Sequence, residues 1–480
     1  MSVLVVDIGS SSVRALVFDA NAQPLPGALA QQAHSFDYSE GGAVADPLAL
    51  AQRVEQCIDD VLRHPAAVQI HAFGMATFVG NLLGLRDGLP VTPLYTYADT
   101  RGQADVDYLK AQTDAQAAHQ RTGCRLHTAY HPVRLHWLRR TQPDLFAQVN
   151  CWSDLATYLY GRWFGLPVPT STSVASWNGL LNRWELAWDT EWLRLLQIPL
   201  GFLPALADYS AAQRGLSVTF AERWPLLRDV PFYLAVGDGV AANIGSGAVL
   251  PGALALSVGT TSAVRQLLPP QPARLPAALW CYQLDKTRTA IGGATSEGGS
   301  VFQWARGVLK DQPLESIEAE LGQRTPDQHG LTVLPMLLGE RAPGWRADAS
   351  GTLHGLTAAT SALDILQALQ EGVALRLALI AEQISGENAP VFATGGAVLS
   401  SPAWAQTICD ALNRRLILVA ESEATARGVA LLELEAGGGF ELNAFPPHVL
   451  RTFSPRAQAV HILRAARDRQ VDLYRRLYNA

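Results

Sequence analysis

The chain has 480 residues, of which 48% are hydrophobic, and this length exceeds what one ordinary hydrophobic core accommodates. It therefore predicts two domains. A formal net charge of −6 gives no basic field that would favour nucleic acid or an anionic membrane surface, so we expect the partner to be a small molecule.

The cysteine pattern indicates a reducing compartment, and the hydropathy pattern predicts no membrane span. Five cysteines lie far apart with no CxxC pair: Cys57, Cys124, Cys151, Cys281 and Cys409. The first residues have no basic leader, and the least polar stretch, "AFGMATFVGNLLGL", is shorter than the roughly 20 residues that span a bilayer. We expect a soluble cytoplasmic protein with no membrane partner. The oligomeric state stays open, with a homodimer as one option.

The first part of the chain alternates apolar strands with amphipathic helices. Strands are expected at 3–9, 14–19 and 70–76, with a helix at 46–64, and this alternation is typical of an α/β fold. The region 95–202 is expected to be helical and carries seven of the twelve tryptophans, most of which we expect in the core.

A second lobe is expected to begin near Leu254. A strand at 231–239 and a helix at 239–248 lead into it, and a short hinge is expected at 245–253, so the predicted domains are 1–247 and 248–480. The later elements are expected to be strands at 289–295 and 391–396 and helices at 361–385 and 458–478.

An internal repeat gives the first functional indication. "LVVDIGSSSVRALVF" from Leu4 aligns with "LALSVGTTSAVRQLL" from Leu254. Both copies predict a β-hairpin whose turn offers backbone and hydroxyl donors, and such a turn can cradle phosphate oxygens. Two hairpins that face each other would grip one nucleotide. Plain surface turns are the alternative.

Other common chemistries lack their motifs. A P-loop needs a lysine after glycine, and none of Lys110, Lys286 and Lys310 follows one. No clear G-x-G-x-x-G opens a helix in a βαβ unit, which argues against a dinucleotide fold. The chain also has no HExxH and no G-x-S-x-G, so metal-centred hydrolysis and serine acyl transfer are without support.

Two aspartates lie at predicted strand ends beside glycine-rich turns. Asp7 precedes the first turn, where a carboxylate can hold Mg²⁺ through water beside phosphates; a turn cap is the alternative. Asp238 lies between two glycines before a small-residue helix, where open α/β sheets place reactive groups. A helix N-cap is the alternative for Asp238.

Two further carboxylate–arginine pairs suit polyhydroxy or anionic ligands. Asp99 and Arg101 in "YADTRG" pair an acceptor with a fork donor, with a surface ion pair as the alternative. Glu340 and Arg341 in "GERAPGW" precede a proline turn, where a structural salt bridge between the lobes competes with ligand contact.

Taken in order, these segments resemble the FGGY carbohydrate kinases. The resemblance is carried by "DIGSSSVR", "YADTRG", "GDGVAANIGSG", "SVGTTS", "GGSVFQW", "GERAPGW" and "ATGGAVLSSPAWAQTICDAL", and it runs from residue 4 to about 432. It implies an α/β, two-lobed, actin/hexokinase-like (ribonuclease H-like) ATPase fold with a duplicated core and an interlobe cleft. The N-terminal lobe would bind sugar and supply the first phosphate hairpin, and the C-terminal lobe would bind the nucleotide.

The resemblance also implies roles for individual residues. Asp238 would be the catalytic base, Asp7 would position Mg²⁺, and Asp99 and Arg101 would lie on the sugar side. The residues implied to contact ATP are Ser11, Ser12 and Arg14 of the first hairpin, Gly259, Thr260 and Thr261 of the second, Gly299 and Gln303, and Gly395, Gly396 and Ser400 at the adenosine.

Departures from the family pattern concern the substrate. Tyr97 stands where many members carry Trp, "GMATFVGN" replaces a Gln or His after the third strand, and Ser171 replaces an aspartate. "TYADTR" with "GERAPGWRADASG" is similar to gluconokinases. We therefore expect a kinase that uses ATP and Mg²⁺ on gluconate, another linear sugar acid or a polyol. A sugar-binding pseudokinase and a regulatory ATPase of the same fold are the alternatives.

Overall fold

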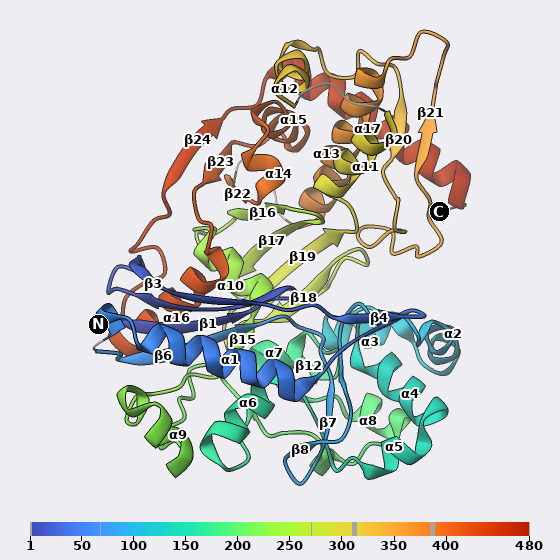
Figure 1. The fold of residues 1–480 in the computed structure, drawn as a ribbon. Helices are drawn as coiled ribbons and strands as arrows, with labels where there is room; N and C mark the ends of the chain where they lie inside the picture. The colour runs from blue at the N-terminus through green and yellow to red at the C-terminus, as the bar shows by residue number, and fades with distance from the viewer. Residues whose placement is uncertain (1, 68, 270, 310–313, 385–388, 480) are drawn as a thin grey trace.

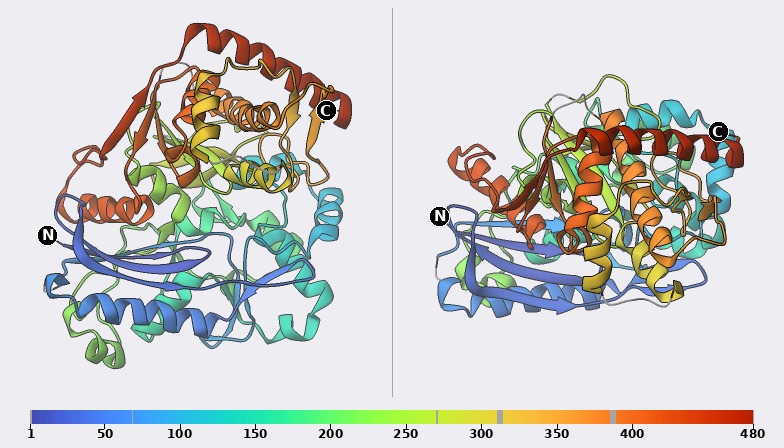
Figure 2. Two further views of the ribbon diagram at one scale, coloured as in Figure 1. Left: turned by 45° about the horizontal axis from the view of Figure 1, so that its top comes forward. Right: turned by 90° about the horizontal axis from the view of Figure 1, so that it is seen from above.

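The computed structural model describes residues 2–67, 69–269, 271–309, 314–384 and 389–479. The amino-terminal half forms one lobe and most of the carboxy-terminal half forms the other, each around a mixed β-sheet with helices on its faces (Figures 1 and 2). No helix in these ranges is long and apolar enough to cross a membrane.

The sheet of the N-terminal lobe has the order β15-β6-β1-β2-β3. β1 (Val3–Ile8) pairs antiparallel with β2 (Ser12–Phe18), which pairs antiparallel with β3 (Pro24–Ala33). β6 (Ala72–Thr77) and β15 (Val236–Gly237) extend the other side in parallel. Every residue of β1 and β6 is buried, which explains their continuous apolar sequences.

The sheet of the C-terminal lobe repeats this pattern. Its β16 pairs antiparallel with β17, β17 antiparallel with β19, and β16 and β22 continue in parallel to β23. Its order is β18 (Trp280–Gln283), β19 (Thr289–Thr295), β17 (Ser262–Leu268), β16 (Leu254–Val258), β22 (Val391–Thr394), β23 (Leu416–Val419) and β24 (Val449–Phe453). The duplicated core expected from the hairpin repeat is therefore present.

The two hairpins differ in turn length. Ile8 pairs with Val13 in the first hairpin, whereas Val258 pairs with Ser262 in the second, so the first turn is one residue longer. The alignment of the two sequence segments, which has no gap, therefore matches equivalent residues on the first strand of each hairpin. On the second strand it is out of register by one residue. In the first hairpin Arg14 lies opposite Asp7 as a result.

Helices cover the N-terminal sheet and build an outer region beside it. α1 (Pro47–Leu62) is capped by Asp46 and buries its apolar stripe against the sheet. The remaining helices are α2 (Gln103–Gln112), α3 (Ala115–Thr122), α4 (His131–Thr141), α5 (Pro143–Gln148), α6 (Leu155–Phe164), α7 (Thr172–Ser176), α8 (Thr190–Leu196) and α9 (Val218–Arg223). The tryptophans here are mostly core residues, with Trp184 exposed.

Short strands interrupt this outer region, which the sequence pattern did not predict. They pair locally and add no strand to the main sheet: β4 (Asp37–Ser39), β5 (Gly42–Ala45) and β9 (Leu94–Tyr95); β7 (Leu83–Arg86), β8 (Leu89–Pro90) and β10 (Cys151–Ser153); β11 (Thr170–Ser171) with β14 (Leu206–Ala207); and β12 (Leu181–Asn182) with β13 (Ala187–Trp188). Strands of two to four residues carry too little periodicity to be recognised in a sequence.

The helices of the C-terminal lobe pack around α13 (Ala362–Ile384), most of which is buried. The others are α11 (Gly299–Leu309), α12 (Leu314–Gln323), α14 (Gly396–Leu399), α15 (Pro402–Leu412) and α17 (Ala457–Tyr478), with a small sheet of β20 (Thr332–Leu334) and β21 (Thr352–His354). The helices expected at 361–385 and 458–478 are therefore confirmed over Ala362–Ile384 and Ala457–Tyr478, and Ser385 lies outside the described residues.

Two helices lie between the sheets and join the lobes (Figure 1). α10 (Asp238–Gly245) follows β15, and α16 (Ala424–Gly438), although it comes from the second half of the chain, packs on β1 and β6 of the first. The strand expected at 231–239 is shorter than predicted because α10 already begins at Asp238.

Candidate functional site

Both hairpin turns present exposed hydroxyls. The Gly9 N–H donates to the Ser12 carbonyl at 2.9 Å, and the Gly259 N–H donates to the Thr261 carbonyl at 3.0 Å, so each turn closes on itself. The side chains of Ser11, Thr260 and Thr261 are exposed, and Ser12 is partly so. This geometry leaves hydroxyl donors free at the tip of each turn, as a phosphate site requires.

Glycines of the C-terminal lobe converge on the second turn. The N–H of Gly299, at the start of α11, donates to the Gly259 carbonyl at 2.7 Å. Gly395 has a φ of +104°, and a Cβ there would lie 2.4 Å from the Val258 carbonyl oxygen, so only glycine fits. Gly396 faces open space, and Gln303 and Ser400 are exposed nearby along α11 and α14. The structure thus brings the predicted nucleotide residues of this lobe together.

Asp238 begins α10 at the end of β15 and is partly buried. Its Oδ1 accepts a hydrogen bond from the Gly239 N–H at 2.7 Å. Asp238 is the first residue of the helix and Gly237 occupies the N-cap position, so the alternative that Asp238 is the N-cap is wrong. Burial raises the pKa of Asp238 to about 6, while the charge of Arg265 opposes this shift. A carboxyl group with this pKa is mainly ionised at neutral pH and can accept a proton.

The glycines beside Asp238 make room for a tryptophan. A Cβ at Gly237 would lie 2.6 Å from Trp177 Nε1, and one at Gly239 would lie 2.8 Å from Trp177 Cη2. Trp177 in turn stacks on Tyr282 of β18, with ring centroids 3.7 Å apart. An aromatic wall built from both lobes therefore supports Asp238, and the sequence pattern did not reveal it because its members are far apart in the chain.

Asp7 lies at the carboxyl end of β1 and is 8% exposed. Burial and the nearby charge of Asp238 raise the pKa of Asp7 to about 7; Arg14 lowers it, and Glu423 raises it. In the described residues its carboxylate accepts no side-chain hydrogen bond. The charges of two neighbouring carboxylates thus raise the pKa of Asp7, and a divalent cation would stabilise its ionised form, so Asp7 fits Mg²⁺.

Arg14 links the lobes. Its Nη1 lies 3.1 Å from Glu423 Oε2, immediately before α16. The resemblance assigned Arg14 to the first phosphate hairpin, and the ion pair gives it a structural partner in the second half of the chain.

Asp99 and Arg101 bind each other. Asp99 is 3% exposed, and the Arg101 Nε lies 3.1 Å from both of its carboxylate oxygens. The Arg101 guanidinium also stacks on Trp137 at 4.5 Å. Tyr97, two residues earlier, is 40% exposed and interacts with Ser10 and with the charge of Asp238. The segment thus presents Tyr97 toward Asp238, whereas Asp99 and Arg101 hold it in place.

Glu340 is buried within the C-terminal lobe. It pairs with Arg376 of α13 and accepts a hydrogen bond from Tyr474 of α17 at 2.6 Å. The salt bridge expected between the lobes is therefore wrong in its location, because the turn packs against helices of its own lobe. The charge of Arg341, the next residue, acts on Arg265 and on His127.

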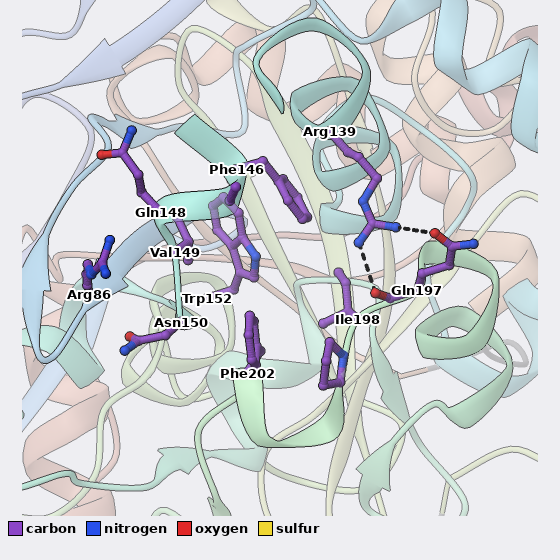
Figure 3. Close-up of a pocket in the computed structure, with 12 residues that line it drawn as sticks. Arg86, Arg139, Phe146, Gln148, Val149, Asn150, Trp152, Gln197, Ile198 and Phe202 are labelled. Atoms are coloured by element: carbon purple, nitrogen blue, oxygen red, sulfur yellow. Dashed lines mark hydrogen bonds between the residues drawn. The ribbon is translucent and has the colours of Figure 1, made fainter. Parts of the chain in front are cut away.

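A separate cavity of about 320 Å³ lies in the outer region of the N-terminal lobe. Phe146, Trp152 and Phe202 line one side, and on the other Arg139 donates to Gln197 (Figure 3). None of the predicted site residues lines it, so it is distinct from the site at Asp238.

Comparisons with known proteins agree with this geometry. Models of the N-terminal and C-terminal domains of the FGGY family of carbohydrate kinases match residues 2–245 and 254–436. A gluconokinase of Bacillus subtilis is 25% identical over 450 residues, 90% of this chain and 87% of the relative. A glycerol kinase of Aromatoleum aromaticum is 30% identical over 449 residues, 89% of this chain and 88% of the relative.

Solved structures show the same arrangement. A gluconate kinase from Lactobacillus acidophilus superposes with a TM-score of 0.91 at 25% identity, over 99% of this chain and 98% of that one. A xylulose kinase from the same organism gives 0.92 at 25% identity, over 100% and 98%. The fold is therefore the two-lobed actin/hexokinase-like ATPase fold, and the chain belongs to the FGGY family of carbohydrate kinases, phosphotransferases that act on sugar hydroxyls.

Proposed function

We propose that this kinase transfers the γ-phosphoryl group of ATP to a hydroxyl of gluconate or a closely related linear sugar acid, with Asp238 as the base. The observation that carries the proposal is the position of Asp238, which follows β15 at the sheet edge where β1 leads into the first phosphate turn. Asp238 also interacts with the charge of Arg265 on the second hairpin and lies beside an aromatic wall. A carboxylate held there would orient the attacking hydroxyl and accept its proton as the bond to phosphorus forms.

The nucleotide would lie between the two hairpin turns. Ser11, Ser12, Thr260 and Thr261 supply donors for the phosphates, and the space beside Gly396 suits the adenosine. Mg²⁺, when bound with ATP, would neutralise phosphate charge, and Asp7 is the residue we assign to hold it through water. Arg14 supports this arrangement by fixing the first hairpin to Glu423.

The substrate would lie on the N-terminal side of Asp238. Tyr97 contributes a hydroxyl and a ring, and Asp99 and Arg101 fix the segment that carries it. Two gluconokinases and a gluconate kinase structure among the relatives support a sugar acid, although glycerol and xylulose kinases resemble the chain to a similar degree. The pseudokinase and the regulatory ATPase gain no support, because the chain has the phosphate hairpins, the candidate base Asp238 and the sugar-side segment "YADTRG".

A coupled assay of ADP release tests this function. The purified full chain with ATP and Mg²⁺ is offered gluconate, other aldonates, polyols, pentuloses and hexuloses in turn. We expect gluconate or another aldonate to stimulate ADP release at least 100-fold over the rate without sugar. Release that no member of the panel stimulates would support the non-catalytic alternative, and stimulation by a ketose alone would reject the sugar acid.

A further inference from the structure

Two arginines of the C-terminal lobe lie near the candidate base without forming a salt bridge in the described residues, although the charge of Asp238 attracts Arg265. Arg265 is on β17, and its Nε lies 3.4 Å from the position that a Cβ at Gly239 would take. Arg341 lies in the loop after β20, and the N–H of its neighbour Ala342 donates to the Ala294 carbonyl at 3.0 Å. Ala294 is on β19, which pairs with β17, and the charge of Arg341 acts on Arg265. In the part of the chain that the structure describes, neither guanidinium forms an ion pair with an acidic side chain.

The hydrogen bonds of Arg265 are also incomplete. Its Nη1 donates to Ser257 Oγ at 3.3 Å, and its Nε is shielded from solvent and has no hydrogen-bond partner among the described residues. An arginine has five N–H donors, and a buried donor without an acceptor is costly. Repulsion between the guanidinium groups of Arg265 and Arg341 adds to the free-energy cost of the unpaired donor. An anion bound between these two side chains would lower both costs.

The surroundings place this anion on the substrate side of Asp238. Arg341 interacts with Tyr97, His127 and Tyr130, which all come from the N-terminal lobe. Burial lowers the pKa of His127 to about 4, so this histidine is neutral at pH 7 and does not compete for an anion. A planar guanidinium binds a carboxylate through two parallel hydrogen bonds, which neutral polyols cannot match.

We propose that Arg265 and Arg341 together receive the carboxylate of the substrate and so determine the selection of sugar acids over neutral polyols. The inference rests on the proposed kinase function and assigns its specificity to two residues. The γ-phosphoryl group of ATP is also an anion that arginine binds. The experiment therefore distinguishes binding of the substrate carboxylate from binding of the γ-phosphoryl group.

Gluconate and glucitol form the matched pair of substrates, because glucitol has the same carbon chain with a neutral CH₂OH in place of the carboxylate. Steady-state kinetics with each substrate and with ATP are measured for the full chain and for Arg265→Gln, Arg341→Gln and Arg265→Lys. Arg86→Gln is the control, since Arg86 is exposed and lines only the distant cavity. Thermal unfolding of every variant monitors folding.

We expect each Gln variant to lose about 10- to 100-fold more of kcat/KM for gluconate than of kcat/KM for glucitol, with KM for ATP changed less than threefold. Arg265→Gln should also lower kcat on both substrates by a common factor, because the charge of Arg265 opposes the rise in the pKa of Asp238. Arg265→Lys, which keeps the charge, should retain more of the gluconate preference than Arg265→Gln. Arg86→Gln should match the unchanged chain.

Equal losses on both substrates with a raised KM for ATP would overturn the proposal and assign the arginines to the phosphoryl group. Should the unchanged chain phosphorylate neither substrate, the proposed function would fail, and calorimetric binding would still decide the inference. Gluconate binding that weakens in both Gln variants supports it, and gluconate binding that the variants leave unaltered, or that is absent, contradicts it.

Discussion

Gly245 of α10 and Gly428 of α16 face each other where the two interlobe helices cross. A Cβ at Gly245 would lie 1.8 Å from the Ala424 carbonyl oxygen, and one at Gly428 would lie 1.8 Å from the Ala241 carbonyl oxygen. Each helix thus packs its backbone against the glycine of the other. The contact is reciprocal, as expected for helices that occupy corresponding places in a duplicated fold.

Gly428→Ala should force these helices apart. Because the obstructing atom is a backbone oxygen, which cannot rotate away, we expect the free energy of unfolding to fall by about 1 to 3 kcal/mol in urea denaturation. The control is Gly307→Ala in α11, where a Cβ would meet nothing within 4 Å and the helix should gain slightly. Equal stability of the two variants would show that the helices separate readily.

Glu433 gives a prediction on the pH dependence of stability. It is 1% exposed in α16, and its Oε2 has no hydrogen-bond partner within the described ranges. Burial raises its pKa well above the ordinary value of 4.5. A carboxyl group with a raised folded pKa contributes stability that is fully present below the unfolded pKa and is lost as the pH rises through the folded pKa.

Glu433→Gln should therefore have nearly the same Tm as the unchanged chain at pH 4.5 and a higher Tm at pH 8. Glutamine is neutral at both pH values. At pH 8 the glutamate of the folded chain must either bind a proton that the unfolded chain releases or carry a charge in the core, and both lower the stability. Thermal unfolding across this range measures it. A difference that does not grow with pH would mean that water or a cation reaches the carboxylate.

Asp7 should affect the metal requirement. Asp7→Asn keeps the shape but removes the charge that we assign to hold Mg²⁺ near the phosphates, so the Mg²⁺ concentration for half-maximal rate should rise by about tenfold or more, which corresponds to about 1.4 kcal/mol. The KM for the sugar should change little. Initial rates over a Mg²⁺ titration decide this, and an unaltered titration curve would reject the metal role.

Asp99→Ala should weaken the sugar site selectively. Removing the carboxylate leaves Arg101 without its partner, which costs about 1 to 3 kcal/mol and frees the segment that presents Tyr97. We expect the sugar KM to rise while the KM for ATP stays within twofold. Asp105→Ala is the matched control, because Asp105 is also buried and paired, with Arg140 at 2.7 Å in the same region. If both variants raise the two KM values equally, Asp99 has only a structural role.

The sequence predicted the fold because the local patterns and the topology agree. Val3–Ile8 and Thr289–Thr295 form strands, and Pro47–Leu62 and Ala362–Ile384 form helices, where the periodicity predicted them. The hairpin repeat indicated the duplication of the sheets. The exchange of α16 onto the N-terminal sheet was not predictable, since an amphipathic pattern identifies a buried face but not the surface that covers it.

The site was predictable where backbone conformation dictates the residue. Gly395 and the glycines of the turns mark close approaches that no side chain permits. Arg265 and Trp177 were missed because their importance comes from contacts across the lobes. A charged residue within the apolar strand 262–268 was the available indication for Arg265. Tyr97 was recognised as a departure, although its position beside Ser10 became evident only in the structure.

The assignment of Asp238 as the base is tested most directly by the kcat of Asp238→Asn on the best sugar found. Asparagine keeps the shape, and its oxygen can still accept the Gly239 N–H, so folding and ATP affinity should be unchanged. It cannot accept the proton of the attacking hydroxyl, and loss of a general base typically costs about 10² to 10⁴ in rate. We therefore predict a fall in kcat of that size with an unchanged KM for ATP. Near-normal turnover by Asp238→Asn would contradict the account, and the base would then be another residue.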